Sequence, residues 1–173
     1  MSQGPKTVAY SRVTMSHMML PQDANPAGIV HGGVVMKHID DAAGVVALRH
    51  TRCNVVTASI DRLDFHNPAF IGNLLSLKAS LNLVGTTSME VGVRVETEDL
   101  RTGQIRHTAS AYLTFVALDE NFHPRPVPPL LLETDEDKRR NRQAKSRRRV
   151  RLAEKTHETS CRTTPEACEL PEE

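Results

Sequence analysis

The sequence has few aromatic residues and no long apolar run. Of its 173 residues none is Trp, two are Tyr and four are Phe. Aliphatic and small side chains must therefore fill the core, which favours a sheet packed closely against a helix. No apolar segment reaches the roughly 20 residues of a membrane-spanning helix, and the first residues lack the apolar stretch of a signal peptide. We expect a cytoplasmic protein that does not enter a membrane.

Cysteines are also few, and their positions fit neither a disulfide framework nor a metal site. Cys53, Cys161 and Cys168 are an odd number of thiols without ligand spacing. This pattern is typical of reduced thiols in a cytosol. Glycine-rich phosphate loops, nucleophile elbows and zinc-binding helix motifs are absent as well.

A strong charge of either sign is lacking too, but the charges are unevenly distributed. The formal net charge is +1, and residues 1–132 carry eleven basic and eleven acidic side chains. Between Lys138 and Arg151, in contrast, there are nine basic residues and no acidic ones. This distribution predicts a neutral globular domain followed by a charged extension.

The hydrophobic pattern predicts one helix and a sheet. Residues 8–18 are expected to form a first strand, residues 20–33 a loop rich in glycine and proline, and residues 34–50 a helix. Alternating apolar and polar residues then predict four strands, at 57–65, 74–84, 89–98 and 107–118. Because short turns join these strands, they are expected to be antiparallel neighbours. The resulting fold class is α+β, with a sheet that curls around the helix and leaves one face or edge for a partner.

The chain loses this periodicity after Leu118. We place the globular domain at residues 1–123 and a proline-rich linker with a charged helix at 124–155. Residues 156–173 are predicted to be a disordered tail. Removal of residues 141–173 is accordingly expected to leave a folded protein.

Asp40 and Asp41 are adjacent in the predicted helix but differ in their surroundings. At about 100° per residue, Asp40 lies among mostly small apolar residues, namely Met36, Ala43, Gly44 and Ala47. Burial of a carboxylate there is costly without a partner, so Asp40 is either a hydrogen-bonded core residue or a catalytic group, and we favour the second. Asp41 faces Lys37, with which it is expected to form an ordinary surface ion pair.

The loop before the helix offers further polar groups. Gly32 and Gly33 lie where the helix begins, so their backbone N–H groups have no intrahelical partner and can stabilise an oxyanion. The alternative is a simple glycine turn. Asn25 either orients a reacting group or closes an Asx turn. His31 and His38 suggest a metal only loosely, because His31 is expected to precede the helix and a third ligand is not placed.

The stretch HGGVVMKHIDDAAG at residues 31–44 makes a family resemblance recognisable. Together with DANPAG before it and NVVTASIDRLDFHNPAFIGN after it, this stretch resembles the acyl-CoA hydrolase branch of the hotdog thioesterases. The segments TTSMEVGVRVETED and PVPPLLLETDEDKRR are similar to that branch as well. The resemblance covers residues 8–140 and leaves the basic stretch beyond Arg140 unassigned.

The resemblance implies a hotdog fold, in which a long helix is wrapped by an antiparallel sheet. It also implies a homodimer with a continuous sheet, and often a hexamer built as a trimer of dimers. Each active site would combine Asn25 of one subunit with Asp40 of the other, and Gly32 and Gly33 would contact the oxyanion. The implied activity, in fatty acid metabolism, is hydrolysis of acyl-CoA to a fatty acid and coenzyme A, without metal or organic cofactor.

In that mechanism Asp40 acts as the general base and Asn25 orients the water or the carbonyl group. The phosphates of coenzyme A need cations or backbone donors, and the candidates are Gly85, Thr86, Thr87 and Ser88. Two alternatives are a non-catalytic hotdog protein that binds or senses acyl-CoA, and a protein that binds nucleic acid through residues 138–151. The second is disfavoured because no aromatic residues are interleaved with the basic ones.

Overall fold

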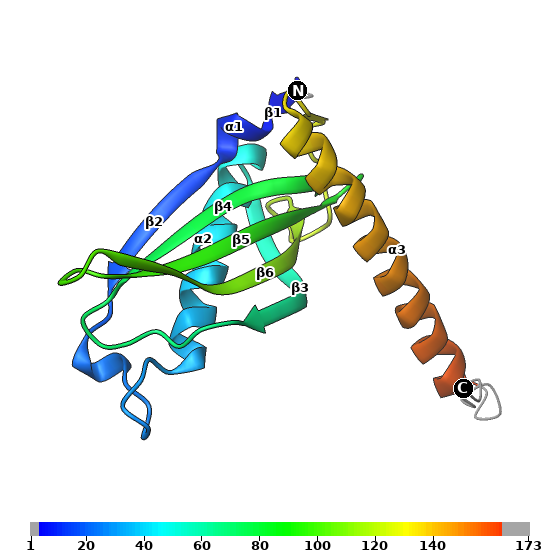
Figure 1. Ribbon diagram of the computed structural model, residues 1–173. Helices are drawn as coiled ribbons and strands as arrows, with labels where there is room; N and C mark the ends of the chain where they lie inside the picture. The colour runs from blue at the N-terminus through cyan, green and yellow to red at the C-terminus, as the bar shows by residue number, and fades with distance from the viewer. Residues whose placement is uncertain (1–3, 164–173) are drawn as a thin grey trace.

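The structure is a computed structural model that describes residues 4–163, with side chains up to residue 160. A five-stranded sheet curls around the long helix α2, and a second long helix, α3, lies on the other side of the sheet (Figure 1). The elements are β1 (Lys6–Thr7), α1 (Val8–Ser11), β2 (Val13–Met18), a 3-10 turn (Pro21–Asp23), α2 (Gly32–Thr51), β3 (Asn54–Phe65), β4 (Leu74–Val84), β5 (Ser88–Asp99), β6 (Gln104–Leu118), β7 (Leu130–Leu131) and α3 (Asp135–Thr163).

The sheet has the strand order β2-β4-β5-β6-β3, and all neighbours are antiparallel. The four strands predicted after the helix are therefore confirmed, as is the α+β hotdog architecture. Strands β2 and β3 form the two edges of this sheet. A separate parallel pair, β1 with β7, ties the beginning of the chain to residues 130–131.

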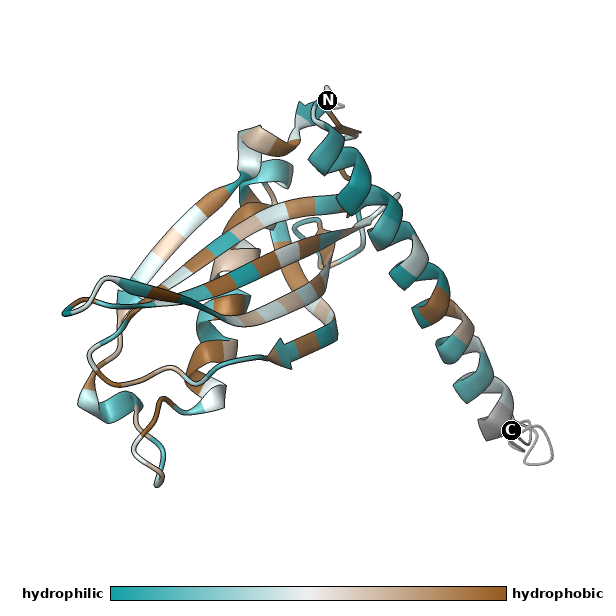
Figure 2. Cartoon of the chain, in the orientation of Figure 1, coloured by the Kyte–Doolittle hydropathy of each residue, from teal (hydrophilic) through white to brown (hydrophobic). Residues whose placement is uncertain are grey.

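The core lies between α2 and one face of the sheet. Ala42, Ala43 and Ala47 are completely buried, and their small side chains let the helix approach the strands closely. The strands contribute alternating buried residues to this core, among them Leu77, Val91 and Leu113. Figure 2 shows the resulting alternation of hydrophobic and hydrophilic bands along the strands. The expectation that small residues line the helix–sheet contact is confirmed.

The first predicted strand is wrong in its N-terminal part. Residues 8–11 form the short helix α1, and the strand begins only at Val13. The Thr7 side chain caps this helix by accepting a hydrogen bond from the Tyr10 backbone N–H at 3.3 Å. The period-two pattern is ambiguous over so few residues, and the capping interaction together with burial of Val8 and Ser11 decides for the helical turn.

Helix α3 packs across the outer, polar face of the sheet. A reciprocal cap starts it: the Asp137 N–H donates to Thr134 Oγ1, and the Thr134 N–H donates to Asp137 Oδ2, both at 3.1 Å. Asn141 and Ala144 are buried against the strands. Figure 2 shows the helix as largely hydrophilic along its length. The charged extension is therefore a packed layer of the structure, which was not expected from its composition.

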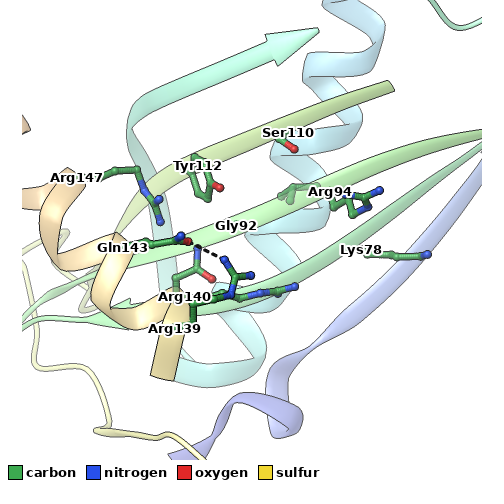
Figure 3. Close-up of a pocket in the computed structure, with 11 residues that line it drawn as sticks. Lys78, Gly92, Arg94, Ser110, Tyr112, Arg139, Arg140, Gln143 and Arg147 are labelled. Atoms are coloured by element: carbon green, nitrogen blue, oxygen red, sulfur yellow. Dashed lines mark hydrogen bonds between the residues drawn. The ribbon is translucent and has the colours of Figure 1, made fainter. Parts of the chain in front are cut away.

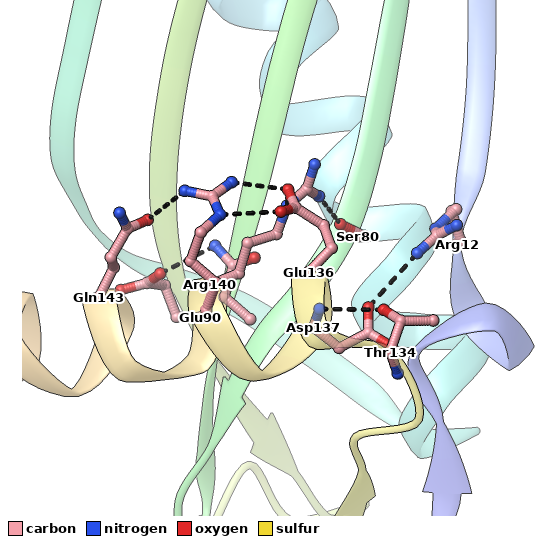
Figure 4. A network of polar contacts seen from close by, with 10 residues as sticks. Arg12, Ser80, Glu90, Thr134, Glu136, Asp137, Arg140 and Gln143 are labelled. Atoms are coloured by element: carbon pink, nitrogen blue, oxygen red, sulfur yellow. Dashed lines mark hydrogen bonds and ion pairs between the residues drawn. The ribbon is translucent and has the colours of Figure 1, made fainter.

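Polar contacts hold this layer in place (Figure 4). Arg140 Nη1 donates to Ser80 Oγ at 3.0 Å, and Asn141 Nδ2 donates to the Asn82 carbonyl at 2.8 Å. Further along, Arg147 pairs with Glu90 at 2.7 Å, and Arg151 pairs with Asp61. Because Glu90 and Asp61 are 3% and 7% exposed at their side chains, they depend on α3 for neutralisation.

Two expectations for the C-terminal region change accordingly. Helix α3 continues to Thr163, so residues 156–163 are helical where a disordered tail was predicted. The remaining tail, residues 164–173, lies outside the described residues. Removal of residues 141–173 is no longer expected to be neutral, because it takes away the partners of Glu90 and Asp61.

We predict that Arg147→Ala lowers the free energy of unfolding by about 2–4 kcal/mol, because it leaves the carboxylate of Glu90 buried without its cation. The matched control is Arg149→Ala, which removes an exposed arginine from the same helix and is expected to change stability by less than about 0.5 kcal/mol. Urea unfolding of both variants measures the difference. Equal stability of the two would contradict the proposed role of α3.

Candidate active site

Asp40 lies at the border between the buried face of α2 and the surface. Its side chain is half-buried, and its Oδ1 atom accepts a hydrogen bond of 2.6 Å from the hydroxyl of Thr57 on the edge strand β3. Ala43 and Ala47 beside it are buried, whereas Met36 is 39% exposed. The carboxylate is thus held at Oδ1, and no partner for Oδ2 is found among residues 4–163, an arrangement that suits a group that receives a proton.

Asp41 has the ordinary environment that its position predicts. It is exposed and pairs with Lys37, one helical turn earlier, at 3.2 Å. An exposed pair of this kind contributes little to stability. The structure therefore confirms the different surroundings of the two adjacent carboxylates.

The sequence alone gives no indication that Thr57 contacts Asp40. A single threonine in a strand of alternating residues has no local signal that separates it from its neighbours. The strand is irregular here, with a shift in its pairing to β6 between Thr57 and Ser59. Only the packing of β3 beside α2 brings the hydroxyl to Asp40.

Asn25 forms the Asx turn that was one of its two interpretations. Its Oδ1 atom accepts hydrogen bonds from the backbone N–H groups of Ala27 and Ile29, at 2.9 and 3.3 Å. The carbonyl end of the amide therefore shapes the loop. Within residues 4–163 the Nδ2 end has no hydrogen-bond partner, so it remains available as a donor.

Asn25 also lines a pocket of about 350 Å³ in front of the helix. Gly32 and Val35 of α2 lie on one side, and Phe65 with the loop that follows it lies on the other. Asp40 and Thr57 do not belong to this pocket. Within one chain, this pocket joins Asn25 to the start of α2 and does not include Asp40.

The two glycines at the helix start have different roles. The N–H of Gly33 donates to Nδ1 of His31, the N-cap residue, at 2.9 Å. The N–H of Gly32 has no partner in the described part of the chain, and Gly32 borders the pocket with Asn25. A Cβ atom at Gly32 would lie 3.7 Å from the Phe65 ring, an ordinary van der Waals contact. Of the two expected oxyanion donors, Gly32 is the available one.

The hairpin between β4 and β5, residues 85–88, is not part of this pocket. The Gly85 N–H closes the turn on the Ser88 carbonyl at 2.7 Å, and the carbonyls of Thr86 and Thr87 accept from later segments of the chain. The hairpin lies beside α3, where a Cβ atom on Gly85 would meet the guanidinium group of Arg148.

The histidines form no metal centre in residues 4–163, where no group of three or more metal-ligating side chains is found. His31 precedes α2 as its N-cap, as expected. His38 stacks on His17 with ring centroids 4.1 Å apart. Burial, and then the neighbouring His17, lower the pKa of His38.

Among residues 4–163, no helix combines the length and apolar character needed to cross a membrane.

Comparison with known proteins places this chain in a family. A sequence profile of the thioesterase superfamily matches residues 27–104. The chain is 39% identical over 145 residues to the cytosolic acyl coenzyme A thioester hydrolase of Mus musculus, covering 83% of this chain and 38% of that relative. The chain therefore spans about two fifths of the length of this curated relative.

Solved structures give the same assignment over nearly their whole length. The chain superposes on an apo-hexameric acyl-CoA thioesterase with a TM-score of 0.85 and 39% identity, covering 88% of this chain and 97% of the other. An acyl-CoA hydrolase from Staphylococcus aureus, in complex with butyryl coenzyme A, coenzyme A and coenzyme A disulfide, gives 0.83 and 34%, with coverages of 90% and 94%. The chain therefore belongs to the thioesterase superfamily and has its hotdog fold.

Proposed function

We propose that this protein is an acyl-CoA thioesterase that hydrolyses acyl-CoA to a fatty acid and coenzyme A. The observation that carries the proposal is the Asp40 carboxylate, half-buried on a helix face of small residues and held by the Thr57 hydroxyl at 2.6 Å. Only Oδ1 of Asp40 has a partner in residues 4–163, so Oδ2 is available to accept a proton.

The spacing of three polar residues supports the assignment. Alanine variants of the Staphylococcus aureus hydrolase have been solved at an aspartate, an asparagine and a threonine. In that protein the asparagine precedes the aspartate by 15 residues, and the threonine follows the aspartate by 17. Asn25, Asp40 and Thr57 have the same two separations. We assign these three residues to the active site.

The proposed reaction uses each group once. Asp40 accepts a proton from a water molecule, whose oxygen attacks the thioester carbon. The Gly32 N–H and the Nδ2 group of Asn25 stabilise the oxyanion of the tetrahedral intermediate. The C–S bond then breaks, and coenzyme A leaves as a thiolate that needs little help from an acid. Gly33 contributes its N–H only when the cap interaction with His31 opens.

A complete site requires two subunits. Asp40 does not line the pocket that holds Asn25, which supports a site in which a two-fold partner brings its Asn25 to each Asp40. The edge strand β3 offers the surface, since Val56 and Ile60 on it are 44% and 43% exposed. We infer a homodimer as the minimal unit and a hexamer, built as a trimer of dimers, as the assembly. A similar solved structure that is hexameric supports the hexamer.

The remaining assignments follow from the same proposal. We propose residues 1–123 as the thioesterase domain, with the proline-rich linker and the charged helix α3 packed onto it. Residues 85–88 are proposed to contact the phosphates of coenzyme A, with Arg148 as the neighbouring cation. A cytoplasmic location is supported by the cytosolic relative.

Nucleic-acid binding by α3 is disfavoured, because Arg147 and Arg151 are neutralised by the sheet residues Glu90 and Asp61.

We predict that Asp40→Asn lowers turnover of acyl-CoA by at least about 100-fold, the usual contribution of a general base. The fold and oligomeric state should persist, because the amide oxygen still accepts from Thr57. Asp41→Asn is the matched control and should retain most of the activity. Release of free thiol from acetyl-CoA measures both. A larger loss in Asp41→Asn than in Asp40→Asn would reject the assignment.

A second prediction concerns the Thr57 hydroxyl. Thr57→Val removes the hydrogen bond to Asp40 at nearly constant shape. Because a hydrogen bond to a charged group contributes roughly 1.5–3 kcal/mol, kcat should fall about 10- to 100-fold. Thr57→Ser keeps the hydroxyl and should recover most of the rate. If valine and serine variants turn over equally, Thr57 does not position the base.

A third prediction tests the sharing of the site between subunits. Asn25→Ala and Asp40→Asn homo-oligomers should each be nearly inactive. A mixed dimer of the two carries both lesions in one site and neither in the other, so its activity should reach up to about half of the wild type. Mixed dimers isolated through two different affinity tags provide the measurement. Inactive mixed dimers would mean that both residues act within one subunit.

A further inference from the structure

A second pocket lies on the face of the sheet opposite α2, under the first half of α3 (Figure 3). Its volume is about 170 Å³. Five basic side chains surround it, Lys78 and Arg94 from β4 and β5, and Arg139, Arg140 and Arg147 from α3. None of the residues assigned to hydrolysis lines it.

The floor of this pocket exists because residue 92 is a glycine. A Cβ atom there would lie 2.6 Å from Nδ2 of Asn82 on the neighbouring strand, so any side chain would fill the space or displace that amide. Asn82 is only 2% exposed, and its Oδ1 atom has no hydrogen-bond partner within the described residues. A polar, recessed floor of this kind suits a ligand that is itself polar.

The pocket carries an excess of positive charge. Its five cations contact three carboxylates, those of Glu90, Glu96 and Glu136. The local balance is therefore two positive charges. Lys78 and Arg94 share Glu96, at 2.5 and 2.7 Å. Within a confined space beside a low-dielectric sheet, such an excess attracts anions.

The carboxylates occupy only some of the guanidinium nitrogens of Arg94, Arg140 and Arg147. Arg94 contacts Glu96 through Nε alone. Arg140 uses Nε for Glu136 and Nη1 for Ser80, and Arg147 uses Nε and Nη2 for Glu90. In residues 4–163 no partner is found for the terminal nitrogens of Arg94, for Nη2 of Arg140 or for Nη1 of Arg147. Three guanidinium groups thus retain donors around one cavity.

The acids and one aromatic ring keep these arginines in place. The guanidinium carbon of Arg147 lies 3.6 Å from the centroid of the Tyr112 ring. Arg139, and then Arg140, lower the pKa of Glu136 to about 2, and Arg94, and then Lys78, lower the pKa of Glu96. Both carboxylates are therefore ionised at neutral pH and hold their arginines before any ligand arrives.

We propose that this pocket binds a phosphate group of a small anionic ligand, at a site separate from the one that hydrolyses the thioester. Planar guanidinium groups match phosphate oxygens in pairs, and several converging arginines are the usual means of holding a phosphate. The bound phosphate would bridge β4 and β5 to α3. The proposal does not depend on the hydrolytic activity, because binding is measured directly.

The test uses the full-length protein and inorganic pyrophosphate as the probe, in isothermal titration calorimetry at constant ionic strength. The wild type is expected to bind saturably, with one site per chain. Arg94→Gln should weaken binding at least about tenfold by removing a charge-assisted contact. Arg94 is 51% exposed at its side chain, so its replacement leaves the core intact.

The matched control is Arg62→Gln. Arg62 pairs with an acid two residues later, Asp64 at 2.5 Å, as Arg94 pairs with Glu96, but it does not line this pocket. Arg62→Gln should bind pyrophosphate like the wild type. No saturable binding by the wild type, or equal affinity in the Arg94→Gln and Arg62→Gln variants, would overturn the proposal.

A kinetic comparison identifies the source of the phosphate. If the pocket receives phosphates of coenzyme A itself, Arg94→Gln should raise KM for acetyl-CoA but not for acetyl-pantetheine, which has no phosphate. If it receives a separate phosphorylated ligand, both KM values should stay unchanged while pyrophosphate affinity falls. Loss of pyrophosphate affinity in Arg94→Gln supports the site in both cases.

Discussion

The structure depends on one close contact, that of α2 with the concave face of the sheet. Ala42, Ala43 and Ala47 are fully buried there, and larger side chains would push the strands away from the helix. Because the sheet can wrap tightly, its edge strand β3 comes level with the middle of α2. This proximity brings the Thr57 hydroxyl to Asp40. The position of the Asp40 carboxylate beside Thr57 therefore depends on the close packing of these small residues.

The outer face of the sheet follows a different principle. Its strands present polar and charged side chains, and α3 covers them through hydrogen bonds and ion pairs instead of an apolar stripe. Such contacts add little net stability but are costly to leave half-formed. They therefore specify where the helix lies. The same arrangement leaves the basic pocket between the helix and the strands.

The proposed active site is divided by the fold. The turn that holds Asn25 and the free N–H of Gly32 face one pocket at the helix start, whereas Asp40 faces the edge strand farther along α2. In the proposed homodimer, a two-fold axis beside β3 would resolve this separation, because symmetry supplies the missing residue to both sites at once. The proposal therefore makes catalysis depend on oligomerisation.

The sequence by itself determined the central helix, the four later strands and the different surroundings of Asp40 and Asp41, because these follow from periodicity and from angles along one element. Its motifs also indicated the hotdog fold. Tertiary structure alone decided the rest. The partner of Asp40, the use of Gly33 in a cap and the packing of α3 depend on contacts between distant segments. Local patterns do not contain such contacts, since a strand residue such as Thr57 acquires its role only from what packs beside it.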